Sequence, residues 1–152
     1  MKILIFSDSH RQFAPLMRAM EKEIQVDRII HAGDVCQDAE DLEIMYPTVP
    51  VIAVKGNNDY FNRDFPEDRF FELGGIKIFL THGHNYGVKY SYSKLWQAAR
   101  EKGADICIFG HTHKAHQEKL DGVELFNPGS AQRSYGVLEI DEKGYTLKLF
   151  EL

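Results

Sequence analysis

The chain has 152 residues, of which 43% are hydrophobic and 27% charged, values typical of a globular protein that can bury its own core. Its formal net charge of −5 argues against a broad, positively charged surface for nucleic-acid binding. Bound metal ions would still allow an anionic substrate. The two cysteines form no paired motif, and no apolar run is long enough for an export signal or a membrane span. We therefore expect a cytoplasmic protein without membrane association.

The first half of the chain alternates short apolar runs with helical patterns. Residues 3–6 predict a buried strand, and apolar positions from Phe13 to Ile24 recur at helical spacing. A second strand over residues 28–32 would complete a parallel βαβ unit. A short helix over residues 38–46 and a third strand over residues 49–54 follow. This half therefore predicts part of a parallel sheet.

The second half is mostly strand. We expect a hairpin over 70–73 and 76–80, a tyrosine-rich loop over 85–93, a helix over 94–102 and a strand over 106–109. A second hairpin over 114–120 and 123–126 and two closing strands over 135–140 and 145–150 complete the chain. The two halves together predict an α/β fold of two packed sheets with helices outside, in one domain of residues 1–152.

Polar side chains follow five of the predicted strands, at the point where each strand ends. They are Asp8 and His10, then Asp34, Asn57 and His82, and finally His111 and His113. Each cluster alone has an ordinary alternative, namely a helix cap, a turn or a solvated side chain. Because ligands of open α/β sheets bind beyond the carboxyl ends of the strands, all five together favour one site.

The residue types at these seven positions predict a metal centre. Seven ligands suit two ions, and a shared carboxylate would hold the ions roughly 3.5 to 4 Å apart. Imidazole and oxygen ligands without a thiolate disfavour calcium and magnesium and favour manganese, iron or zinc. Ligand type does not choose among these metals; we take manganese as the first expectation, with iron, zinc, nickel and cobalt as alternatives.

The polar motifs, in chain order, resemble those of the calcineurin-like metallophosphoesterase superfamily. They are Asp8-x-His10, Gly33-Asp34, Gly56-Asn57-Asn58-Asp59, His82-Gly83-His84 and Gly110-His111-Thr112-His113. The short length and the turn Asn127-Pro128-Gly129-Ser130 are most similar to its small YfcE-like phosphodiesterases. The resemblance implies a four-layer αββα sandwich, with two mixed β-sheets packed face to face and helices outside.

The resemblance also implies a ligand set and a reaction. One metal ion would be held by Asp8, His10, Asp34 and His113, and the other by Asp34, Asn57, His82 and His111. Asp34 would thus be shared between the two ions. A hydroxide bridging the ions would attack phosphorus in line, and the metal charges would stabilise the transition state.

The chain departs from the family pattern at Asn58, where many of these phosphatases have a histidine that donates a proton or contacts phosphate. An asparagine amide donates a hydrogen bond but cannot protonate an alkoxide. We therefore expect Asn58 to hold a phosphoryl oxygen, and diesters or good leaving groups to be preferred. His84 is the nearby substitute acid, with a supporting or solvated position as its alternative. Asp59 is expected to orient His10.

The leading hypothesis is a metal-dependent phosphodiesterase that acts on a small phosphoester. One alternative is a phosphomonoesterase or protein phosphatase of the same superfamily. Another is a non-catalytic scaffold like the retromer subunit, which keeps the fold but has substitutions at metal positions. The retained ligand types favour an enzyme. Arg133 is expected at the surface, with a phosphate contact as its alternative, and the exposed hairpins would allow a homo-oligomer.

Overall fold

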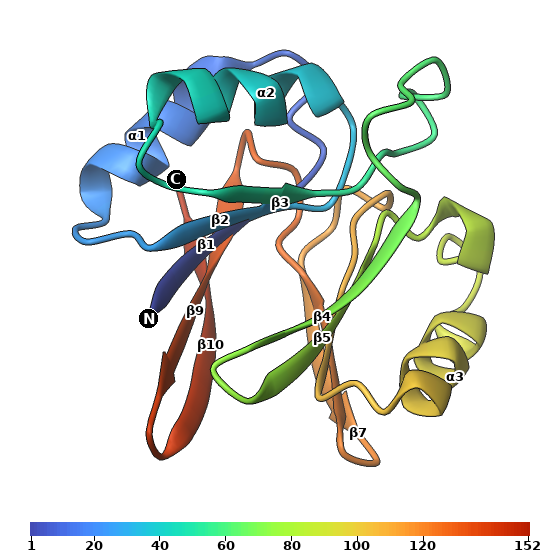
Figure 1. Ribbon diagram of the computed structural model, residues 1–152. Coiled ribbons are helices and arrows are strands. Elements are labelled where there is room, and N and C mark those ends of the chain that lie inside the picture. The colour runs from blue at the N-terminus through green and yellow to red at the C-terminus, as the bar shows by residue number, and fades with distance from the viewer.

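The computed structural model describes residues 1–152 and contains ten strands, three α-helices and one 3₁₀ turn (Figure 1). The strands are β1 (Lys2–Phe6), β2 (Arg28–His31), β3 (Val51–Ala53), β4 (Asp68–Leu73), β5 (Ile76–Thr81), β6 (Ile106–Ile108), β7 (His116–Leu120), β8 (Val123–Asn127), β9 (Ser134–Asp141) and β10 (Gly144–Glu151). The helices are α1 (Phe13–Lys22), α2 (Cys36–Met45) and α3 (Ser93–Lys102), and the 3₁₀ turn is η1 (His84–Tyr86).

The strands form two mixed sheets of five. The first has the order β10-β9-β1-β2-β3 and the second β4-β5-β6-β8-β7. In the first sheet β1, β2 and β3 are parallel, with α1 and α2 as the crossover helices. In the second sheet β5, β6 and β8 are parallel. The carboxyl ends of the parallel strands therefore lie at one edge of each sheet.

The buried hydrophobic side chains form three clusters, one between the two sheets and one between each sheet and its helices. Ile3 and Ile5 of β1 pack against side chains of the second sheet such as Ile108, in the cluster between the sheets. Leu4 lies on the opposite face of β1, because successive strand residues point to opposite sides, and packs with Leu16 of α1. A third cluster joins the second sheet to α3. The predicted four-layer αββα arrangement is confirmed.

Several predicted element ends were wrong, among them those of the first helix and the third strand. The first helix ends at Lys22, and Ile24 is 73% exposed rather than on the buried face. The third strand begins at Val51 rather than at residue 49, since Pro50 has no N–H for the ladder. None of the helices has the length and apolar character that crossing a membrane requires.

Candidate metal centre

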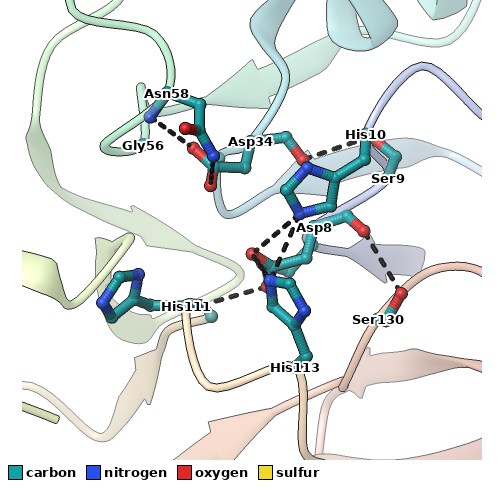
Figure 2. Close-up of polar contacts among 12 residues, drawn as sticks. Asp8, Ser9, His10, Asp34, Gly56, Asn58, His111, His113 and Ser130 are labelled. Atoms are coloured by element: carbon teal, nitrogen blue, oxygen red, sulfur yellow. Dashed lines mark hydrogen bonds and ion pairs between the residues drawn. The ribbon is translucent and has the colours of Figure 1, made fainter. Parts of the chain in front are cut away.

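The seven predicted ligands all lie past the carboxyl ends of the parallel strands. Asp8 and His10 follow β1, Asp34 follows β2 and Asn57 follows β3. In the second sheet His82 directly follows β5, while His111 and His113 follow β6. Figure 2 shows the side chains of Asp8, His10 and His113 pointing toward one another, although His10 and His113 are 103 residues apart in the chain. The packing of the two sheets brings their edges together and creates the site.

A first group of ligands surrounds the buried carboxylate of Asp8. Its Oδ1 has no hydrogen-bond partner, whereas Oδ2 accepts hydrogen bonds from the Ser7 hydroxyl and the His111 N–H. The Nε2 atoms of His113 and His10 lie 3.3 and 3.9 Å from Oδ1 and 3.2 Å from each other. Two donors bound to one zinc-sized cation lie roughly 3.0–3.4 Å apart. Both distances from His113 fall in this range, and His10 lies somewhat farther from Asp8; the three residues form a group that could hold a metal ion.

A second group forms around His82. Its Nδ1–H donates to the carbonyl of Ala32 at 2.7 Å, which turns Nε2 toward the carboxylates, as is common for metal-binding histidines. Nε2 lies 3.5 Å from Oδ2 of Asp34 and 3.8 Å from Oδ1 of Asp8. The amide oxygen of Asn57 lies 3.0 Å both from this nitrogen and from Nδ1 of His111. Asp8, Asp34 and His82 thus form a second group that could hold a cation, and His111 is linked to it through Asn57.

The two groups adjoin each other through Asp8. Its ligand atoms belong to both clusters that fit a cation, one with His10 and His113 and the other with Asp34 and His82. The resemblance instead assigns the shared position to Asp34. That Asp34 bridges two ions stays a prediction.

The electrostatics of the site favour added positive charge. Burial raises the pKa of Asp8, although His82 and the hydrogen bond from Ser7 oppose the shift. Burial also opposes ionisation of Asp34. The hydrogen bond and the charge of His82, together with two hydrogen bonds from Asn58, outweigh burial and hold the pKa of Asp34 below its usual range. Burial would lower the pKa of His82, yet both carboxylates raise it. Two buried carboxylates side by side attract a cation.

The backbone of the site is held in an unfavourable conformation. Five of the seven predicted ligands have positive φ: Asp8 (53°), His10 (49°), Asp34 (49°), His111 (72°) and His113 (61°). Such values are uncommon outside glycine and concentrate at functional sites, where the surrounding structure enforces them. Part of this support is the turn after β8, since Ser130 Oγ donates to the Asp8 carbonyl and Ala131 N–H to that of Ser7.

Two motif glycines allow the close approach of the ligand loops. A Cβ at Gly110 would overlap the Ser7 hydroxyl and Oδ2 of Asp8. A Cβ at Gly56 would overlap Oδ1 of Asp34. The glycines before Asn57 and His111 are therefore required by the packing of the site itself.

Asn58 and Asp59 have different contacts from those expected. The Asn58 amide donates to Oδ2 of Asp34 at 2.7 Å (Figure 2), so it supports a predicted ligand, and a contact with phosphate stays a prediction for its second amide hydrogen. The expectation that Asp59 orients His10 is wrong. The Asp59 carboxylate accepts backbone N–H groups of Asp34, Cys36 and Gly56 and so ties together the loops after β2 and β3.

His84 lies beside the predicted ligands. Its ring centroid is 5.5 Å from that of His82 and 6.0 Å from that of His111. Its Nδ1 is buried and has no hydrogen-bond partner, and burial together with the charge of His82 lowers its pKa. His84 is therefore near enough to serve the site, and its role as an acid stays a prediction.

A buried polar network behind His10 was missed from the sequence. The Ser9 hydroxyl donates to Asp38 at 2.5 Å and lies 2.9 Å from Nε2 of His31. Asp38 also accepts the N–H of Arg11 at 2.9 Å, so it holds the residues on both sides of His10. His31 is fully buried. A serine between two predicted ligands was the one available signal for this network.

Comparison with known proteins agrees with this geometry. The profile described as the calcineurin-like phosphoesterase superfamily domain matches residues 1–143. The chain belongs to this superfamily. Among its calcineurin-like relatives, the probable metallophosphoesterase YsnB of Bacillus subtilis is 36% identical, over 99% of this chain and 91% of its own length. Phosphodiesterase MJ0936 of Methanocaldococcus jannaschii is 30% identical, over 95% of this chain and 96% of its own.

Two solved structures have the same fold. A predicted phosphoesterase from Streptococcus pneumoniae superposes with a TM-score of 0.80 at 29% identity, covering 99% of this chain and 88% of its own. The Vps29 protein of Entamoeba histolytica, solved with zinc, gives a TM-score of 0.78 at 23% identity, with 99% of both chains covered. At that identity the second likeness shows the fold alone.

Proposed function

We propose that residues 1–152 form one metallophosphoesterase domain that uses two divalent metal ions, manganese first among them, to hydrolyse phosphodiesters. The observation that carries the proposal is the buried Oδ1 of Asp8, which has no hydrogen-bond partner and faces three imidazole nitrogens at 3.3, 3.8 and 3.9 Å. A buried carboxylate oxygen in that setting needs a cation. The name of MJ0936, a phosphodiesterase, supports the same reaction class.

Each group of residues has a defined task in this proposal. Bound divalent ions would supply an activated water and positive charge for the transition state. His10 and His113 hold one side of the site with Asp8, while His82, His111 and Asn57 hold the other. Burial and the nearby His82 lower the pKa of His111 to about 4, so its imidazole is neutral and able to ligate at neutral pH.

The preference for good leaving groups rests on the proton supply at Asn58. Its amide is engaged with Asp34 at 2.7 Å and has no titratable proton for a leaving group. His84 is the remaining nearby imidazole, and its pKa is lowered by burial, so little of it is protonated at neutral pH. Leaving groups that depart without a proton, such as nitrophenolate, are therefore favoured over alkoxides.

The test compares bis(p-nitrophenyl) phosphate with p-nitrophenyl phosphate, two substrates with the same leaving group. We expect turnover that requires added Mn²⁺, is abolished by EDTA and is faster on the diester. A clear monoester preference would favour the phosphomonoesterase alternative. A folded protein that binds Mn²⁺ but hydrolyses neither ester would favour the scaffold.

A further inference from the structure

A groove of about 550 Å³ lies directly beside the candidate metal centre. His113 forms part of its wall, together with Lys114 from the same loop. Gln132 and Arg133 come from the segment between β8 and β9, and Leu149 and Glu151 from β10. Ligand sites of proteins have volumes of roughly 300–1,000 Å³, so the groove has room for a group the size of a nucleoside.

The groove is structurally continuous with the metal centre. His113 is shared by both: its Nε2 lies 3.3 Å from Oδ1 of Asp8, while 51% of its side chain is exposed. The segment that carries Gln132 and Arg133 is attached to the Asp8 loop, because Ser130 Oγ donates to the Asp8 carbonyl at 3.3 Å and Ala131 N–H to the Ser7 carbonyl at 2.9 Å. A substrate with its phosphorus at the metal ions would thus extend into the groove past His113.

The charges of the groove differ from those of the whole protein. The chain has a net charge of −5, yet Lys114 and Arg133 both line this groove, are exposed, and form no ion pair. Glu151 is the one acidic side chain in the lining, and it is not paired with either cation. Two unpaired cations that line one groove provide hydrogen-bond donors for a phosphate group, and an arginine can offer two parallel N–H groups.

We propose that this groove binds a second phosphate group of the substrate, held by Arg133 and Lys114, while the scissile diester lies at the metal centre. The inference rests on the proposed function and narrows it to phosphodiesters that carry an additional phosphate. Leu149 and the stem of Lys114 offer apolar contact to the sugar that would separate the two phosphates.

The first test uses two esters with the same scissile bond and leaving group: thymidine 5′-(p-nitrophenyl phosphate) with and without a 3′-phosphate. The Mn²⁺-loaded wild-type protein should cleave the 3′-phosphorylated ester with about tenfold higher kcat/KM, since a hydrogen bond between charged groups is worth that factor or more. In Arg133→Ala the ratio between the two esters should fall clearly, and in the double variant Arg133→Ala/Lys114→Ala it should fall to nearly one. The matched control Lys143→Ala, in the turn between β9 and β10, should keep the wild-type ratio.

The second test measures binding without turnover. Isothermal titration of the Mn²⁺-loaded protein with thymidine 3′,5′-bisphosphate and with thymidine 5′-monophosphate should show tighter binding of the bisphosphate, by about tenfold at low salt, and less discrimination at high salt. Arg133→Ala should discriminate less between the two nucleotides than the wild type does. If both esters are cleaved at equal rates and both nucleotides bind equally to the wild type, the second-phosphate site is refuted while the phosphodiesterase stands. If neither ester is cleaved but the bisphosphate still binds more tightly, the proposed function fails and the anion site stands.

Discussion

The Asn58 side chain is hydrogen-bonded to Asp34 rather than directed away from the metal centre: its amide donates to Oδ2 at 2.7 Å and its backbone N–H to Oδ1 at 3.0 Å. Both oxygens of a predicted metal ligand are therefore oriented by one residue. Asn58 stands where the family pattern often has a histidine. In this chain it supports the predicted metal ligand Asp34.

Asn58→Ala should weaken metal binding, because Asp34 loses the amide that orients it. Loss of such a supporting contact costs about 10–100-fold in metal affinity or activity. Mn²⁺ affinity measured by calorimetry and kcat/KM on bis(p-nitrophenyl) phosphate would report the effect. Asn85→Ala, which removes an exposed amide that contacts Glu67, should change neither. Unaltered Mn²⁺ affinity in Asn58→Ala would contradict a supporting role.

Asp8→Asn should remove the stabilisation that metal binding gives to the fold. A ligand at a hundred times its Kd stabilises by about 2.7 kcal/mol, which corresponds to a Tm increase of about 5–10 °C for a chain of this length. We expect Mn²⁺ to raise the Tm of the wild type and of Glu142→Gln by this amount, but not that of Asp8→Asn. An equal rise in Asp8→Asn would show that the cation binds elsewhere.

Gly110→Ala should disrupt the site through steric overlap. The added Cβ would meet the Ser7 hydroxyl and Oδ2 of Asp8, and such overpacking costs about 1–3 kcal/mol. Gly122→Ala is the matched control, since its Cβ meets nothing within 4 Å although its φ of +82° adds strain. Both variants should unfold at lower urea concentration, but only Gly110→Ala should lose Mn²⁺ affinity. Retained Mn²⁺ affinity in Gly110→Ala would refute this account of the glycine.

His31 should make the metal-free protein less stable at acid pH. Burial lowers its pKa to about 4 from an ordinary value of 6.5, so between these values the unfolded chain binds a proton that the folded chain does not. Stability is therefore complete above pH 6.5 and declines as the pH falls toward 4, by about 3 kcal/mol. Urea unfolding in EDTA from pH 7.5 to 4 would measure this decline. In His31→Gln the free energy of unfolding should decline by about 3 kcal/mol less over this pH range. An equal decline in both proteins would exclude His31 as the cause.

His84→Ala should affect substrates according to their leaving groups. If the His84 imidazolium protonates the leaving group, its loss costs about tenfold or more for a methyl or ribose alkoxide and little for nitrophenolate. Because burial lowers the pKa of His84, the wild-type rate on alkoxide esters should decline as the pH rises through a value below 6.5. The same rate and the same pH profile in His84→Ala would end this role.

Much of the fold was readable from the chain alone, because it depends on local patterns. Alternating apolar residues such as Ile3, Leu4 and Ile5 determine which face of a strand is buried. A glycine followed by polar residues, as at Gly33-Asp34, marks a strand end. The approximate strands, the helices and the position of seven polar residues just past strand ends follow from this periodicity. Element ends were less predictable, as at Pro50, because they depend on neighbouring strands.

Contacts between segments distant in sequence were decided only by the tertiary structure. Asp59 lies one residue from Asn58, yet it turns to the backbone of the loop after β2, because the buried N–H groups of Asp34, Cys36 and Gly56 need an acceptor. Likewise, only the packing of the loop after β6 against the segment between β8 and β9 places Lys114 and Arg133 on one groove beside His113. The residue types in the sequence predict metal chemistry. Which residues each side chain contacts, and in which direction it points, depends on how the two sheets pack together.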